Sequence, residues 1–219
     1  MPQLFTRSAD LVFRAALIGI PLALVSLGAI AGVIARSDWI TEVGLRPGQP
    51  VPFSHAHHVG QLGIDCRYCH GSVEESASAG YPPTHTCMTC HSQVWRTAPM
   101  LAPVRDSLAE GKPLRWRRVA RLPDYVYFRH DIHIAKGVGC VECHGRVDKM
   151  PLMVREKPFT MKFCLSCHRD PGPHLRYEKA GFDLASAPAG GDAARATALM
   201  HHYAIRDSHA LTNCYVCHR

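Results

Sequence analysis

The longest hydrophobic stretch of the chain lies near its amino terminus. Residues 15–35 carry no charged side chain and are bounded by Arg14 and Arg36. A helix rises about 1.5 Å per residue, so this stretch would span about 31 Å, which matches the hydrocarbon core of a bilayer. The pattern therefore predicts a transmembrane helix over 15–35, preceded by a short amino-terminal segment, 1–14.

A secretory signal peptide is the alternative interpretation of this stretch, with Arg7 and Arg14 as its basic start. The apolar region of a signal peptide is usually shorter, about 7–15 residues. We therefore expect a retained anchor helix.

Downstream of residue 36 the pattern changes. Neither a long 3.6-residue period nor a sustained alternation of apolar and polar residues is present. The chain has 16 prolines and 17 glycines, which interrupt most of its segments. Residues 36–219 are therefore predicted to form one domain of short α-helices and irregular loops.

All ten cysteines fall in five copies of the pattern Cys-x-x-Cys-His. We number these copies sites 1 to 5 in chain order. Their residues are Cys66, Cys69 and His70; Cys87, Cys90 and His91; Cys140, Cys143 and His144; Cys164, Cys167 and His168; and Cys214, Cys217 and His218.

This pattern attaches c-type haem, and its histidine supplies the proximal iron ligand. Disulfides, structural zinc and a thioredoxin-like redox pair are the alternatives. Disulfides do not require a histidine after the second cysteine of each pair. Structural zinc needs two cysteine pairs per site, and five pairs cannot all be matched. A thioredoxin-like redox pair would occur once and not five times. Five covalent c-type haems are therefore predicted.

Five haems in 184 residues leave roughly 37 residues for each haem. Such a chain cannot build a conventional protein core, so the porphyrins are expected to form it. The predicted fold is a class III-like multihaem cytochrome c, with short α-helices and irregular loops wrapped around the haems.

An internal repeat organises this domain. Phe-x-His-x-x-His, a glycine and an attachment motif occur in 53–71 and again in 128–145. A second motif follows in each case, which predicts two dihaem modules, about 53–100 and 128–174, and a fifth haem at the carboxyl end. The Ala/Gly-rich segment 180–198 is expected to be a surface loop or linker.

The repeat also indicates distal iron ligands. His55, His58, His130 and His133 recur at equivalent places, and histidines three residues apart project from one helical face. The other histidines lack this support: His57, His85, His174, His201, His202 and His209.

One haem is then left without a distal histidine. Methionine is the natural substitute because Met/His ligation raises the reduction potential. Met150 is the first candidate, followed by Met153 and Met161. These methionines would otherwise pad a porphyrin face, and His209 is the rival ligand.

The formal net charge of +7 and the pI of about 9.0 do not require nucleic acid. Five haems bring about ten propionate carboxylates, which offset much of this charge. The basic run is interpreted as a set of propionate partners or a docking face, and a solvated loop is the alternative. The run consists of Lys112, Arg115, Arg117, Arg118 and Arg121.

These features together resemble the pentahaem cytochrome c subunit of bacterial alternative complex III, a quinol:electron-acceptor oxidoreductase. The resemblance covers essentially the whole chain except the Ala/Gly-rich segment. It rests on the anchor helix, the order of motif spacings and several short matches. These are Phe-Ser-His-x-x-His at 53–58, Gly-Ile-Asp-Cys at 63–66, Pro-Pro-Thr at 82–84, Leu-Pro-Asp-Tyr at 122–125 and Leu-Thr-Asn-Cys at 211–214.

The resemblance implies an electron-transfer subunit of a respiratory or photosynthetic complex, not an enzyme on its own. Iron–sulfur and polytopic membrane subunits would be its partners. A monohaem cytochrome c, a copper protein or a terminal oxidase would accept the electrons. Haem is attached outside the bacterial inner membrane, so the haem domain is expected in the periplasm and the amino terminus in the cytoplasm.

Two other functions remain as alternatives. One is a free-standing, membrane-anchored multihaem quinol dehydrogenase that feeds a periplasmic reductase. The other is a multihaem enzyme such as a nitrite reductase, which needs an open iron position that is often marked by lysine in place of the motif histidine. All five motifs end in histidine, which argues against such an enzyme.

Overall fold

The apolar stretch near the amino terminus forms one long helix, α1 (Arg7–Arg36), in a computed structural model that describes residues 6–177 and 180–218. The helix begins earlier than predicted because Thr6 caps it: its Oγ1 accepts a hydrogen bond from the backbone N–H of Ala9. Residues 1–5 of the predicted amino-terminal segment lie outside the described residues.

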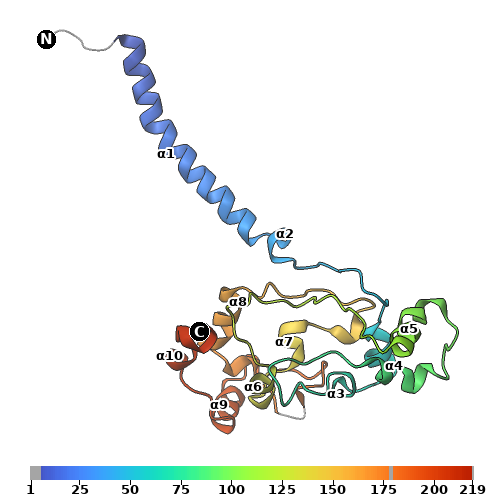
Figure 1. Cartoon of the computed structure of the whole chain (residues 1–219). Coiled ribbons are helices and arrows are strands. Elements are labelled where there is room, and N and C mark those ends of the chain that lie inside the picture. Colours follow the sequence, from blue (N-terminus) through green and yellow to red (C-terminus); the bar gives the residue numbers. More distant parts are fainter. Residues whose placement is uncertain (1–5, 178–179, 219) are drawn as a thin grey trace. The chain divides into compact units, whose positions relative to one another are not determined.

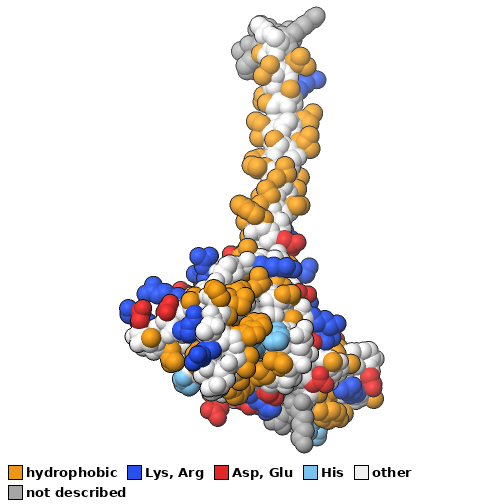
Figure 2. Space-filling view, turned by 90° about the vertical axis from the view of Figure 1, so that its right-hand side faces the viewer, with side chains coloured by type: hydrophobic (Ala, Val, Ile, Leu, Met, Phe, Trp, Pro, Cys, Tyr) orange, Lys and Arg blue, Asp and Glu red, His pale blue; other side chains and the backbone are white. Residues whose placement is uncertain are grey.

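Helix α1 is long and apolar enough to cross a membrane, with a mean hydropathy of 2.4. Its hydrophobic side chains are exposed, and Figure 2 shows them along the visible face of the helix. Pro21 lies inside the helix without interrupting it. The predicted anchor helix is therefore present, and α2 (Asp38–Thr41) follows it.

Two compact units divide the chain, residues 1–42 and 43–219. The second unit consists of short helices and loops, and its described residues contain no β-strand, only an isolated bridge between Val138 and Leu175 (Figure 1). The fold class predicted from the sequence is thus confirmed. Its helical segments are η1 (Ala56–Gln61), α3 (Cys66–Cys69), α4 (Thr84–His91), η2 (Pro99–Leu101), α5 (Ala102–Glu110), α6 (His130–Ala135), α7 (Cys140–His144), η3 (Val147–Lys149), α8 (Met161–Arg169), η4 (Gly172–His174), α9 (Ala193–His202), α10 (Ser208–Leu211) and α11 (Cys214–Cys217).

Among the described residues, buried side chains form two small apolar clusters. Val51, Leu101 and Val104 make the first, where α4 packs on α5. The second lies where α9 packs on η4, and it contains Leu175, Ala189, Ala196, Leu199 and Tyr203. Neither cluster is large enough to be the core of the 177 residues of the second unit, which agrees with the expectation that haems form this core.

The second cluster corrects one expectation. The segment 180–198 is expected to be a surface loop or linker, but its end, from Ala193 on, belongs to helix α9 (Ala193–His202), in which Ala196 and Leu199 are buried. Asp192 caps this helix by accepting a hydrogen bond from the N–H of Arg195, 3.0 Å away. Alanine is a strong helix former, so an alanine-rich segment with one capping aspartate and one buried leucine folds against η4.

The recurrent glycines of the repeat have a backbone reason. Gly63 and Gly137 both have positive φ, 67° and 78°, which glycine adopts without strain. At Gly137 a side chain would also collide with the ring of Tyr203, because a Cβ atom would lie 2.4 Å from it. The turn before each module's first attachment motif therefore requires glycine.

Replacing Leu199 with alanine should lower the free energy of unfolding by about 2–5 kcal/mol, because the substitution leaves a cavity in the second apolar cluster. Thermal unfolding of the haem-loaded protein, followed by far-ultraviolet circular dichroism, measures this loss. Leu108→Ala makes the same change in helix α5 at a side chain that is 46% exposed, and it should cost less than about 1 kcal/mol. Equal losses for the two variants would contradict the assigned core.

Candidate metal centre

Both cysteines of each attachment motif lie in a short helix, and three of these helices have a side-chain cap. Asp65 accepts a hydrogen bond from the N–H of Arg67 at 2.8 Å, and Asn213 accepts one from Tyr215 at 3.0 Å. Thr160 does the same for Phe163 before the fourth motif. One turn of helix places both cysteines of a motif on the same side, as attachment to one porphyrin requires.

All ten cysteines are free thiols, which removes support for the disulfide interpretation. The described residues also contain no group of three or more cysteine, histidine or acidic side chains placed to hold an ion directly, as structural zinc would need. Burial raises the pKa of the Cys140 thiol to about 11 and that of Cys143 to about 12.

Three motif histidines face a histidine of the repeat across a similar gap. The ring centroids are 6.2 Å apart for His91 and His58, and 6.3 Å apart for His144 and His130. For His168 the facing ring is that of His133, at 6.1 Å. Sites 2, 3 and 4 therefore each contain a pair of opposed imidazoles.

The gap fits one metal ion between two imidazole nitrogens. A metal–imidazole bond is about 2.0 Å long, so two such bonds and the two ring radii separate the centroids by about 6 Å. Direct contact, or a hydrogen bond of about 2.9 Å between the two nitrogens, would bring the ring centroids closer, to about 5 Å. The residues at these three sites therefore fit a haem iron with two axial histidines.

Hydrogen bonds at Nδ1 orient these imidazoles. Nδ1 of His58 lies 2.9 Å from the carbonyl oxygen of Ser54, and that of His133 lies 2.7 Å from the oxygen of Arg129. A histidine that donates its Nδ1–H to a carbonyl presents a bare Nε2 to a metal. The same bond occurs at His70 to Gly80, His91 to Val94, His130 to Ala77, His168 to Leu211 and His218 to Tyr125.

Site 1 brings His70 together with His55, close enough for His70 to lower the pKa of His55. Burial is the larger cause, and the pKa of His55 falls to about 4. Burial has the same effect on His144 at site 3, where His130 adds to it. Both imidazoles are thus neutral at physiological pH, the form that binds a metal.

Site 5 differs from the other four. The ring against His218 is that of Tyr125, 5.9 Å away, and the backbone carbonyl oxygen of Tyr125 lies 3.2 Å from Nδ1 of His218. Met150 is buried, and its carbonyl oxygen accepts a hydrogen bond from the N–H of Ala56 in the first module. Met153 is half-buried, whereas Met161 and His209 are exposed. Met150 as the fifth distal ligand stays a prediction.

His174 has a partner that its spacing did not reveal. Its Nδ1 lies 3.0 Å from Glu142, which also forms a 2.9 Å ion pair with Arg176, an arginine that is only 2% exposed. The hydrogen bond to Glu142 raises the pKa of His174. Glu142 stands between the two cysteines of site 3, so this cluster ties the third motif to the chain that follows η4. A variable position inside a motif carries no sequence signal for such a role.

The cysteines show the order of the sites in space. Burial raises the pKa of several of these thiols, and at Cys69, Cys140, Cys143 and Cys164 a thiol from another site adds to this effect. Cys87 of site 2 acts on Cys69 of site 1, and Cys66 of site 1 acts on Cys140 of site 3. Cys167 and Cys164 of site 4 act on Cys143 of site 3, and Cys217 of site 5 acts on Cys164. The spatial order is therefore 2–1–3–4–5, which differs from the chain order.

The basic run lies on the surface around two open hollows. Arg115 and Arg117 line one of about 350 Å³, with Gly48 to Pro50. Arg117, Arg118 and Arg121 line the other, of about 440 Å³. Lys112 pairs with Glu110 at 2.9 Å. Three arginines around one hollow suit an anion, which agrees with a role toward propionates or an acidic partner.

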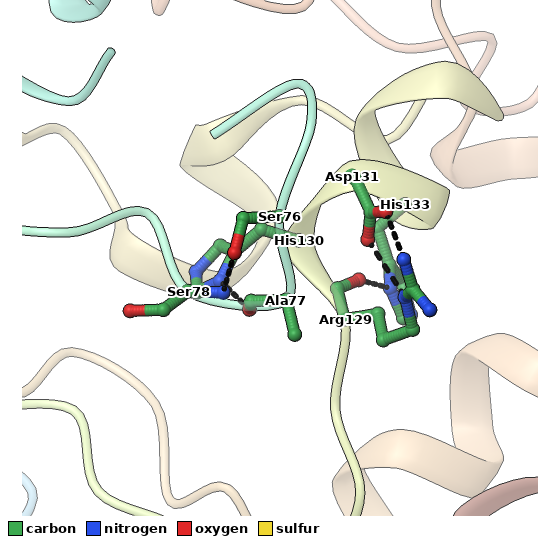
Figure 3. A network of polar contacts seen from close by, with 7 residues as sticks. All are labelled: Ser76, Ala77, Ser78, Arg129, His130, Asp131 and His133. Atoms are coloured by element: carbon green, nitrogen blue, oxygen red, sulfur yellow. Dashed lines mark hydrogen bonds and ion pairs between the residues drawn. The ribbon is translucent and has the colours of Figure 1, made fainter. Parts of the chain in front are cut away.

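The modules dock on each other through a distal-ligand helix. Figure 3 shows His130 of α6 against the loop Ser76–Ser78 of the first module, where Ala77 accepts hydrogen bonds from both Nδ1 and the backbone N–H of His130. The N–H of Asp131 donates to the carbonyl of Ser76, and Asp131 pairs with Arg129. His130, a predicted distal ligand of the second module, is thus held by the loop Ser76–Ser78.

Comparison with known proteins agrees with this geometry. No family model matches the chain. The chain is 29% identical over 178 residues to the "menaquinone reductase, multiheme cytochrome c subunit" of Nitratidesulfovibrio vulgaris strain Hildenborough, covering 78% of this chain and 77% of that protein. The similarity supports a multihaem cytochrome c subunit of a quinone-linked complex. It does not single out alternative complex III.

His58→Ala should convert the iron of site 2 from low-spin to high-spin, because it removes the imidazole that faces His91. The adjacent His57→Ala is the matched control, since Nδ1 of His57 pairs with Gln61 at 2.8 Å. Optical and electron paramagnetic resonance (EPR) spectra of the oxidised, haem-loaded variants give the readout. A low-spin spectrum in His58→Ala identical to that of the unaltered protein would refute this ligand pair, and His133→Ala tests site 4 in the same way.

Proposed function

We propose that this chain is the electron-transfer subunit of a quinone-linked membrane complex and carries five covalent c-type haems. The observation that supports this most strongly is the set of opposed imidazoles, in which a motif histidine faces a repeat histidine at 6.1–6.3 Å three times. Catalytic haem sites need an open iron position. Sites 2, 3 and 4 offer two histidines each, which suits electron transfer and not substrate binding.

The spatial order 2–1–3–4–5 supports a single path through the domain. When bound, the haems accept and release one electron each, and electrons tunnel between neighbours. The protein residues hold the attachment points side by side, exclude water and fix the axial ligands. Cys90 and Cys214, the two exposed cysteines, belong to sites 2 and 5, so the ends of the path are also the sites that partner proteins can approach.

We place quinol oxidation at the start of this path and a periplasmic acceptor at its end, with iron–sulfur and polytopic subunits as partners. Helix α1 anchors the subunit in the inner membrane, and the haem domain faces the periplasm, where c-type haem is attached. The acceptor would be a monohaem cytochrome c or another small redox protein. The subunit is not an enzyme by itself.

The reverse direction is the second candidate, because the similar protein from Nitratidesulfovibrio vulgaris is named a menaquinone reductase. A path of haems conducts in either direction, and the difference in potential between its two partners decides which. In that case electrons enter from a periplasmic donor and leave to menaquinone.

Purification of the tagged chain from membranes in mild detergent tests the proposal. We expect a mass increase of five haem groups per chain, co-purifying iron–sulfur and polytopic subunits, and reduction of the haems by a menaquinol analogue. Reduction of the quinone by pre-reduced haems, with no reaction in the opposite direction, would establish the second candidate. A lone homo-oligomer that oxidises quinol would instead establish a free-standing quinol dehydrogenase.

Met150→His should lower the potential of one haem and leave the haem content unchanged, because imidazole replaces the thioether that favours the reduced iron. A potentiometric titration of the purified complex follows the five haems. Met153→His provides the matched control on the same loop. Five unchanged potentials in Met150→His would remove Met150 from the set of ligands.

A further inference from the structure

A phenylalanine precedes each pair of distal histidines, two residues before the first of them. These are Phe53, before His55 and His58, and Phe128, before His130 and His133. The two phenylalanines are part of the repeat, but the ligation of iron does not require them. Their side chains are half-buried, in contact with the imidazoles.

The contacts are the same in both modules. The ring of Phe53 meets His55 edge-on, at 4.9 Å and 87°, and stacks on His58, at 4.4 Å and 25°. The ring of Phe128 meets His130 at 4.8 Å and 88° and stacks on His133 at 4.5 Å and 29°. Each phenylalanine is therefore a wedge between two imidazoles that serve different sites.

The wedge determines ring orientation together with the hydrogen bonds at Nδ1. The second histidine of each pair donates to the residue directly after the phenylalanine, His58 to Ser54 and His133 to Arg129. This bond leaves the imidazole free to rock about its Nδ1–H direction. The stacked phenylalanine face removes that freedom, because tilting the imidazole would press its edge into the phenylalanine ring.

The first histidine of each pair is held differently in the two modules. Ala77 holds His130 through two hydrogen bonds (Figure 3). Nδ1 of His55 is buried and has no hydrogen-bond partner among the described residues. Phe53 therefore contributes more to the orientation of His55 than Phe128 contributes to the orientation of His130.

We propose that Phe53 and Phe128 are positioning residues that set the planes of the distal imidazoles relative to the motif histidines; the proposal rests on the haem ligation proposed above. The planes meet at 64° for His58 and His91, at 6° for His130 and His144, and at 32° for His133 and His168. The unpaired electron of low-spin ferric iron occupies an orbital that these planes orient. The angle therefore controls the EPR spectrum and contributes to the reduction potential.

Phe53→Leu and Phe128→Leu test the proposal, because leucine fills the space but has no flat face. Haem content is measured first. Fewer than five haems in the unaltered protein would count against the proposed function, whereas loss of haem in a variant alone is thereby separated from a change in ligand orientation. With five haems retained, Phe53→Leu should shift and broaden the low-spin EPR signals of sites 1 and 2 only. Phe128→Leu should act on sites 3 and 4 only, and less on site 3 than Phe53→Leu acts on site 1.

Three further variants complete the experiment. Phe53→Tyr and Phe128→Tyr keep the flat ring and should restore the unaltered signals. Phe182→Leu is the matched control, because the Phe182 ring contacts the guanidinium of Arg67 and no histidine, and it should leave all five signals unchanged. Where a leucine variant loses haem, the methionine variant, equally without a flat face, takes its place.

Unchanged signals in fully loaded Phe53→Leu and Phe128→Leu proteins would overturn the proposal. Changes of the same size in Phe182→Leu would do so as well, since they would show a general response of the domain to a lost aromatic ring. A change of these signals from low-spin to high-spin would mean that a distal histidine no longer binds its iron once the phenylalanine is replaced, which supports the positioning role.

Discussion

The distance between opposed imidazoles is the constraint on which the rest of this structure depends. Rings 6.1–6.3 Å apart neither pack against each other nor form a hydrogen bond, so protein atoms alone give no reason for the gap. An iron bound to both Nε2 atoms would explain this gap. Nδ1 bonds to backbone carbonyls hold most of these rings in place without a metal, which would limit the entropy lost on binding.

The remainder of the fold serves this constraint. Short capped helices present each Cys-x-x-Cys-His motif, glycines turn the chain before sites 1 and 3, and the two small apolar clusters pack α4 on α5 and α9 on η4. The loop Ser76–Ser78 joins the modules by accepting hydrogen bonds from His130 and Asp131. The proposed path through the five sites follows the spatial order of neighbouring sites and not the order of the motifs in the chain.

Much of this could be predicted from the sequence, because the attachment motif and its repeat are local patterns. The helical-loop fold came from the missing periodicity and the many prolines and glycines, and the anchor helix came from an uncharged stretch. The choice of His55, His58, His130 and His133 as candidate ligands came from the repeat. The pairing of these histidines with individual motifs could not be predicted, since it depends on long-range packing. Helix α9 was missed because its buried residues, Ala196 and Leu199, are too few to give a periodic signal, and the partner of His174 was missed because a position inside a motif is free to vary.

The most direct test of the central claim is near-infrared magnetic circular dichroism of the oxidised, haem-loaded protein at low temperature. Its charge-transfer band identifies the axial ligands of low-spin ferric haem. This account predicts the band of two histidines for four haems, from His55, His58, His130 and His133 opposite their motif histidines, and a distinct band for the fifth. Fewer than four haems with two histidine ligands, or high-spin iron at the sites of the opposed rings, would contradict it.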